Sequence, residues 1–159
     1  MTVSLARSRE TLSLLKLMGC VCLALPLFTT QEYADEDDSD YKIFMEKNVH
    51  FVKDQKVWEE KISEARREGK TVVANFSASW CGPCRVMAPY YSELSEMYPS
   101  LVFLVIDVDE MNEFSSTWDI HATPTFFFLK DGVQVADKLV GANKTELLTR
   151  ITSLVDSTT

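Results

Sequence analysis

The chain has 159 residues and a formal net charge of −8, with 46% hydrophobic and 25% charged residues, which is ordinary for a globular protein. The length suffices for one domain with a hydrophobic core plus a tail. The acidic balance and the lack of a basic stripe argue against nucleic-acid binding, and the four cysteines, of which Cys20 and Cys22 lie near the N-terminus, are too few for a disulfide framework.

Residues 1–45 are expected to form an N-terminal extension, and residues 46–159 the folded domain. Basic residues precede an apolar run, Leu17–Phe28, that is too short to span a membrane as a helix. Its length suits the hydrophobic region of a secretory or organellar signal, although Pro26 interrupts it and no clear A-x-A cleavage site follows. The acidic segment at residues 35–40 is typical of a solvated linker.

Residues 18–22, with the sequence MGCVC, resemble the start of an acylated protein. If translation begins at Met18, Gly19 could carry a myristoyl group and Cys20 a palmitoyl group, and two chains anchor a protein stably. The match is partial, because the sixth position of the motif is Leu23 instead of Ser or Thr. Three interpretations of the N-terminal segment therefore remain open: an acylated, membrane-associated tail, a secretory or organellar signal, and a disordered tail with no targeting function.

The first part of the domain predicts a strand, a helix and a second strand. Val49–Val52 alternates weakly, as an edge strand does. The spacing of apolar residues predicts a helix over Gln55–Arg67, ended by Gly69, and the run Thr71–Phe76 predicts a buried strand. The core face of the helix is a stripe at helical spacing, made by Trp58 and Ile62 with Ala65.

The motif Cys81-Gly82-Pro83-Cys84 follows this strand and opens a helical pattern, which indicates redox chemistry. Unpaired N–H groups and the helix dipole stabilise a thiolate at a helix start, so we expect Cys81 to be exposed and nucleophilic. Cys84, one turn further, should be more buried and act as the resolving thiol. Gly82 allows close approach of another chain, and Pro83 lacks an N–H that would be unpaired anyway. A zinc half-site, which would need a second ligand pair, and a static disulfide are the alternatives.

The helix after this motif has its apolar side at Met87, Tyr91, Leu94 and Met97. Pro89 lies inside this helix and should kink it. The continuous apolar run Leu101–Val108 predicts a buried parallel strand, and Glu110–Trp118 a short helix.

The last part of the chain predicts a hairpin and a helix. Thr125–Leu129 and Val133–Val140 are strands joined by the turn signal Asp131-Gly132. Asn143 and Glu146 offer an N-cap and a capping box for the final helix. The order β-α-β-α-β-α-β-β-α predicts an α/β fold, a mixed sheet with helices on both faces.

From about Val49 to its end the chain resembles the thioredoxin family, and within it the plant h-type thioredoxins. The resemblance rests on residues 72–85 (VVANFSASWCGPCR), 107–110 (DVDE), 118–125 (WDIHATPT) and 141–142 (GA). It implies the thioredoxin fold and a monomer without bound cofactor or metal, in which a reversible Cys81–Cys84 disulfide reduces client proteins. Electrons would come from a thioredoxin reductase or from glutathione and glutaredoxin, and Cys20 or Cys22 could serve as an extra redox cysteine.

The resemblance also implies a binding surface beside the cysteines. Thr123-Pro124 matches the cis-proline loop of the family, whose geometry lets the Thr123 backbone pair with an extended client strand. The apolar docking surface would consist of Trp80, Gly82, Pro83, Thr123, Pro124, Gly141 and Ala142.

Asn75 departs from the family pattern, in which a buried Asp precedes the Phe of this strand and assists proton transfer at the resolving thiol. Asn cannot titrate, so it cannot act as a general base. Val105 stands where relatives often carry a charged residue near that Asp. We therefore expect Cys84 to lose its proton through water or to the leaving thiolate, and activity to depend less steeply on pH, unless Asn75 is merely a tolerated isostere.

Neither His50 nor His121 has a second ligand at metal spacing, so both are expected at the surface or in the core. Three functions remain open: a cytoplasmic disulfide reductase, a disulfide oxidase or isomerase of the secretory pathway, and a non-catalytic binding module on a membrane surface. The Gly82-Pro83 dipeptide disfavours the second, because oxidising relatives usually carry a His there.

Overall fold

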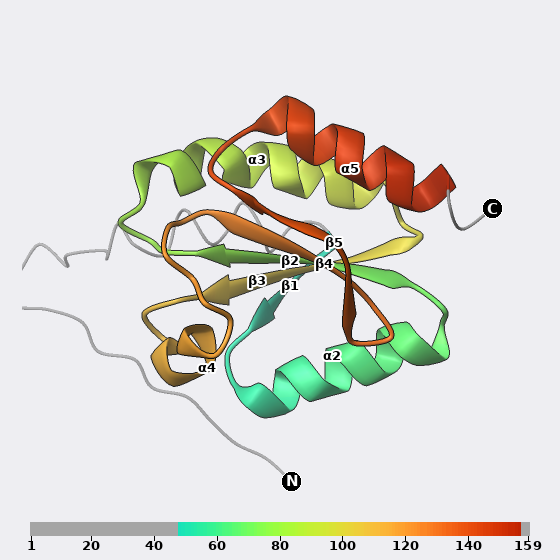
Figure 1. Cartoon of the computed structure of the whole chain (residues 1–159), viewed down its shortest axis with the longest axis horizontal. Coiled ribbons are helices and arrows are strands. Elements are labelled where there is room, and N and C mark those ends of the chain that lie inside the picture. Colours follow the sequence, from blue (N-terminus) through green and yellow to red (C-terminus); the bar gives the residue numbers. More distant parts are fainter. Residues whose placement is uncertain (1–47, 157–159) are drawn as a thin grey trace, which may run out of the picture. The chain divides into compact units, whose positions relative to one another are not determined.

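The computed structural model describes residues 48–156 as a five-stranded mixed sheet with the strand order β1-β3-β2-β4-β5 (Figure 1). The strands are β1 (Val49–Val52), β2 (Thr71–Ser77), β3 (Leu101–Asp107), β4 (Thr125–Lys130) and β5 (Val133–Val140). Strands β1, β3 and β2 are parallel, whereas β4 runs antiparallel to β2, and β5 antiparallel to β4. The mixed sheet and the edge position of β1 are thus confirmed.

Within residues 48–156, four helices cover the sheet from both sides. They are α2 (Gln55–Arg67), α3 (Gly82–Met97), α4 (Asn112–Ser116) and α5 (Lys144–Asp156). Figure 1 shows α3 and α5 together on one face, and α2 and α4 on the other. The central strand β2 is buried along its whole length, and this strand leads directly into the cysteine motif.

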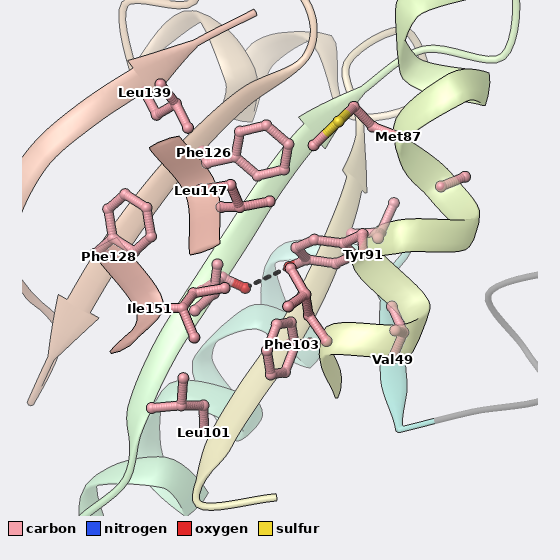
Figure 2. Packing of buried hydrophobic residues seen from close by; sticks show 14 residues of the cluster. Val49, Met87, Tyr91, Leu101, Phe103, Phe126, Phe128, Leu139, Leu147 and Ile151 are labelled. Carbon is pink, nitrogen blue, oxygen red and sulfur yellow. Dashed lines mark hydrogen bonds between the residues drawn. The ribbon is translucent and has the colours of Figure 1, made fainter. Parts of the chain in front are cut away.

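The core beneath α3 and α5 contains Tyr91, a fully buried side chain from α3 (Figure 2). Its hydroxyl lies 2.7 Å from the carbonyl oxygen of Val73 on β2 and 2.9 Å from that of Leu104 on β3. Burial raises the pKa of Tyr91 well above its usual range. The hydroxyl therefore stays neutral, and its single proton is shared between the two carbonyl oxygens, which links α3 to β2 and β3.

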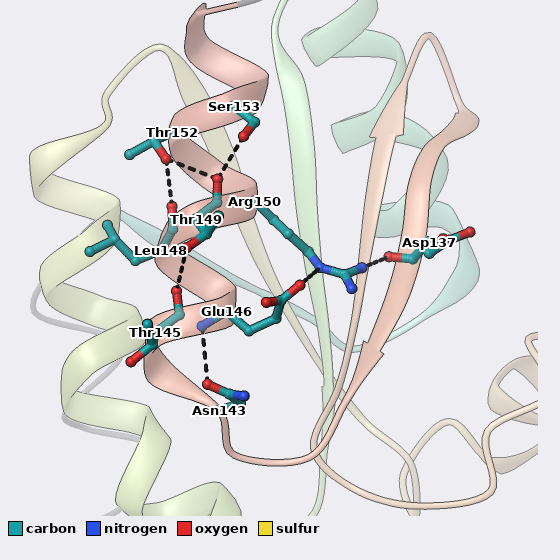
Figure 3. A network of polar contacts seen from close by, with 9 residues as sticks. All are labelled: Asp137, Asn143, Thr145, Glu146, Leu148, Thr149, Arg150, Thr152 and Ser153. Carbon is teal, nitrogen blue, oxygen red and sulfur yellow. Dashed lines mark hydrogen bonds and ion pairs between the residues drawn. The ribbon is translucent and has the colours of Figure 1, made fainter.

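The final helix is fastened to the sheet by a polar network (Figure 3). Asn143 Oδ1 accepts the backbone N–H of Glu146 at 3.0 Å, which confirms the N-cap. The Glu146 carboxylate accepts from Arg150 Nε at 2.7 Å and does not complete the capping box. Arg150 also donates to the carbonyl oxygen of Asp137, so this side chain joins α5 to β5.

Two details of the predicted elements are wrong. The helix expected over Glu110–Trp118 is shorter, because Met111, just before α4, has φ −112° and ψ 46°, which lie outside the helical range. Met97 is 64% exposed instead of facing the core. It is the last residue of α3, and the next residue, Tyr98, packs against the core in its place.

The predicted hairpin turn is confirmed. Asp131 and Gly132 have φ values of +55° and +81°, the left-handed values that a two-residue hairpin turn requires. The kink expected at Pro89 remains a prediction, although α3 continues through this residue.

Candidate active site

Cys81 is the N-cap residue of α3, with extended backbone angles of −78° and 106°. Its Sγ accepts the backbone N–H of Cys84 at 3.3 Å, much as the oxygen of a Ser or Asp does at other helix starts. Gly82 and Pro83 are the first two residues of the helix, and Cys81 and Cys84 form a disulfide with their Cα atoms 5.2 Å apart. The sulfur at the helix end therefore belongs to Cys81.

The exposure expected for Cys81 is wrong for this disulfide form. Cys81 is 4% exposed and Cys84 3%, and both pack with Ala78 and Val108. The carbonyl oxygen of Thr123 lies 3.4 Å from Cys81 Sγ and helps to cover it. The disulfide has no proton to donate to this carbonyl, whereas a reduced Cys81 thiol would have one.

The cis-proline loop expected from the resemblance is present, with a cis bond between Thr123 and Pro124. Thr123 is partly exposed, whereas Pro124 is buried. The Pro124 carbonyl accepts the N–H of Gly141 at 2.8 Å, and Gly141 has a φ of +94°, which favours glycine. The structure thus places Thr123, Pro124 and Gly141 together near the disulfide, and exposed Ala142 follows Gly141.

Trp80, which is 68% exposed, borders a groove of about 310 Å³ beside the disulfide. Its indole Nε1 donates to Asp109 Oδ2 at 2.6 Å. The groove is lined by Trp80, Val108, Asp109, Asn112, Ser115, Ser116, Ile120, His121, Ala122 and Thr123. Trp80 and Thr123 are predicted docking residues that line this groove, whereas Gly82 and Pro83 open α3 and Gly141 follows β5.

The role of Asp109 was not predicted from the sequence. Asp107 Oδ1 accepts the N–H groups of Asp109 at 2.8 Å and Glu110 at 3.2 Å. This turn directs the Asp109 carboxylate toward the indole. Two acidic residues two positions apart at the end of a buried strand were the available signal, because Asp side chains often cap such turns.

Asn75 is 1% exposed and lies opposite Val105 on β3 and Phe126 on β4. Its side chain is therefore surrounded on the sheet by apolar neighbours, and within the described residues Oδ1 has no hydrogen-bond partner. The replacement of an expected carboxylate by an amide thus leaves this part of the core without a charge.

His121 lies at the surface and pairs with Asp119, their Nε2 and Oδ1 atoms being 2.8 Å apart. Across residues 48–156 no group of three or more His, Cys, Asp or Glu side chains could hold a metal ion. No helix in that part of the chain is long and apolar enough to cross a membrane. The predicted acylation residues Gly19 and Cys20, and also Cys22, lie outside the described residues.

Comparison with known proteins gives a consistent picture. The family model described as thioredoxin matches residues 48–153. The chain is 61% identical over 122 residues to an H-type thioredoxin of Populus jackii, covering 77% of this chain and 87% of that protein. It is 58% identical over 128 residues to thioredoxin H4-1 of Oryza sativa subsp. japonica, covering 80% and 95%. The crystal structure of a poplar wild-type thioredoxin h has a TM-score of 0.67 and 65% identity, covering 69% of this chain and 97% of that one.

Proposed function

Since the chain belongs to the thioredoxin family and is a protein-disulfide reductase of the h type with Cys81 and Cys84 as its redox pair, we propose that Cys81 attacks the client and Cys84 resolves. The observation that supports this assignment is the N-cap position of Cys81. Its sulfur accepts an N–H at the positive end of a helix of 16 residues. Both effects stabilise a thiolate there and lower the pKa of a thiol.

The reaction begins with the reduced protein. The Cys81 thiolate attacks one sulfur of a client disulfide, forming a mixed disulfide and expelling the other client sulfur as a thiolate. Cys84 then loses its proton and attacks Cys81 Sγ, and the second client sulfur leaves. Two electrons and two protons pass to the client, which becomes a dithiol, and the Cys81–Cys84 disulfide described above is the product.

Clients dock, in this proposal, on the apolar surface around the disulfide. Trp80, next to Cys81 in the chain, is 68% exposed, and the partly exposed Gly141 and exposed Ala142 lie beside the cis-proline loop. Thr123 makes no backbone–backbone hydrogen bond within residues 48–156, so its N–H and carbonyl can pair with an extended client segment. A shallow apolar surface of this kind suits partners of varied sequence.

We propose that Asn75 changes the route by which the Cys84 thiol loses its proton, and that the disulfide exchange itself is unchanged. An amide cannot accept the proton of Cys84, and its neighbours Val105 and Phe126 cannot either. The proton therefore passes to water or to the departing client thiolate. Activity should then lack the titration of a buried carboxylate, and its pH dependence should be set by the thiols.

The assignment is tested with pre-reduced protein and insulin as the client. Cys81→Ser should abolish insulin reduction and form no mixed disulfide. Cys84→Ser should trap a mixed disulfide through Cys81 that mass spectrometry detects. A Cys20→Ser, Cys22→Ser variant serves as the control for removing cysteines outside the motif, and it should reduce insulin like the wild type. Trapping by Cys81→Ser instead would reverse the roles.

The reductant is the next part of the proposal. Thioredoxins act on disulfide-containing clients and are themselves reduced by a reductase; we propose either an NADPH-dependent thioredoxin reductase or glutathione with glutaredoxin as the donor here. Separate recycling assays with each donor would distinguish them. A redox titration tests the oxidase alternative, because a reductase should titrate near about −270 mV, the value typical of thioredoxins as a class, and a disulfide isomerase near about −180 mV.

Thioredoxins of the h type are generally cytosolic, and we propose that this chain can also associate with membranes through acylation. The support is the sequence around Gly19 and Cys20, which would be acylated if translation begins at Met18. The intact mass of the native protein tests this, because it reports the start site and any acyl group together. A mass that shows cleavage after the apolar run would instead support the signal-peptide alternative.

A further inference from the structure

The segment between α4 and β4 forms one wall of the groove beside Trp80. Ile120, His121 and Thr123 line this wall. The carbonyl oxygen of Thr123 lies 3.4 Å from Cys81 Sγ. The position of the segment therefore determines the shape of the site in which a client meets the attacking sulfur.

Backbone pairing does not hold this wall in place. Within residues 48–156, no backbone–backbone hydrogen bond involves residues 119–123. Side chains provide the connections instead. At the C-terminal end of the wall, Thr125 Oγ1 donates to the carbonyl of Ala122 at 2.7 Å. At its N-terminal end, the connection comes from Lys138 on β5.

Lys138 holds both the backbone and the side chain of Asp119. Its Nζ donates to the Asp119 carbonyl oxygen at 2.9 Å and lies 3.3 Å from Oδ2. Asp119 Oδ1 faces His121 Nε2 at 2.8 Å. Asp119 has a φ of +53°, a left-handed value that residues other than glycine rarely adopt, although Asp tolerates it better than most. One ammonium group thus holds the residue at which the chain reverses into the groove wall.

The charges of this cluster agree with the geometry. The hydrogen bond from Lys138 is the main cause, ahead of the charge of His121, of a lowered pKa of the Asp119 carboxyl. The Asp119 side chain is 73% exposed and that of Lys138 33%. Solvent screens exposed pairs, so the contribution to overall stability is small. The consequence of the contact should lie in the local position of the wall.

We propose that Lys138 and Asp119 are positioning residues for client docking, which fix the segment from Ile120 to Thr123 against β5 so that the groove fits a protein client. This inference rests on the proposed function, because it concerns a wall of the same site. Neither residue reaches the disulfide sulfurs. A small disulfide that meets Cys81 without filling the groove should therefore not respond to their loss.

The test compares two disulfides with pre-reduced full-length protein. Lys138→Met keeps the stem near the Phe127 ring, whose centroid lies 5.9 Å from Nζ, and removes the charge. We expect its rate constant for insulin reduction to fall about two- to five-fold, as for loss of a partly exposed ion pair, with the rate for bis(2-hydroxyethyl) disulfide unchanged. Lys138→Arg should restore the insulin rate. Lys56→Met is the control, because it removes the same positive charge from a lysine on α2 whose side chain is 84% exposed and does not line the groove.

A second variant, Asp119→Asn, removes the carboxylate while keeping a residue that tolerates a left-handed φ; it should slow insulin reduction selectively as well. Thermal unfolding verifies that each variant is folded, and Asp119→Asn replaces Lys138→Met if the latter is not. The inference is overturned if these variants behave like Lys56→Met, or if both disulfides slow equally. Failure of the wild type to outperform Cys81→Ser on insulin would instead overturn the proposed function.

Discussion

Asn75→Asp would place a carboxyl group at a position that is 1% exposed, between Val105 and Phe126. Burial without a charged partner raises a carboxyl pKa by several units. If the folded-state pKa reaches 7 or more, against about 3.9 in the unfolded chain, the variant loses up to about 4 kcal/mol of stability at pH 7. That is a large part of the stability of a domain of this size.

The sign of the pH dependence follows from proton binding. A raised folded-state pKa means that the native variant binds more protons than its unfolded form. Stability is therefore fullest below about pH 4 and is lost as pH rises, at about 1.4 kcal/mol per pH unit, until the folded-state pKa is passed. Wild type has no such carboxyl at this position, so the difference between the two proteins should widen between pH 4 and 7.

Urea unfolding of the oxidised proteins from pH 4 to 8 measures this difference. Asn75→Leu is the control, because it removes the amide without adding a titrating group, and its difference from wild type should be constant over this range. Insulin reduction by Asn75→Asp should acquire a pH dependence that wild type lacks. A constant stability difference together with an unchanged activity profile would refute the reasoning, because the new carboxylate would then be solvated or paired.

Three other variants test separate contacts. Tyr91→Phe removes a buried hydroxyl that faces two strand carbonyls and should cost about 1–3 kcal/mol in urea unfolding; a smaller loss would mean that water replaces it. Asp109→Ala should free the Trp80 indole and lower the insulin rate about two-fold or more, whereas Asp109→Asn, which keeps an acceptor, should not. Burial, and then the charge of Lys61, lowers the pKa of His50, so stability should fall as pH drops from about 6.5 toward the folded-state pKa. His50→Gln should flatten that slope, and an equal slope in both proteins would contradict the assignment.

The sheet and helices could be predicted because hydrophobic periodicity is a local property of the chain. The buried run into β2, the apolar run of β3 and the Asp131-Gly132 turn each contain their own signal. The start of α4 could not, because it is set by the non-helical backbone of Met111. The conformation of Met111 accompanies its burial in the core, which residue spacing does not record.

The candidate active site likewise has features that the sequence predicts and features that it does not. The motif around Cys81 and Cys84 is contiguous, so its place at a helix start was visible in the sequence. The burial of Cys81 was not, because part of its cover comes from Val108 and from Thr123, which lies 42 residues further along the chain. The contact between Lys138 and Asp119 also joins distant segments, and nothing in the spacing of a Lys and an Asp distinguishes it from two solvated charges.

Strand β2 is bonded to neighbours on both sides and ends only four residues before Cys81. A strand that is buried along its whole length therefore supports the redox-active sulfurs. Gain or loss of two electrons at the sulfurs should leave β2 unchanged. The surface that the protein presents to its clients should therefore have nearly the same shape in both redox forms. Amide hydrogen exchange in β2 should consequently be slow and equal in the two forms, while differences gather in the short loop that follows it.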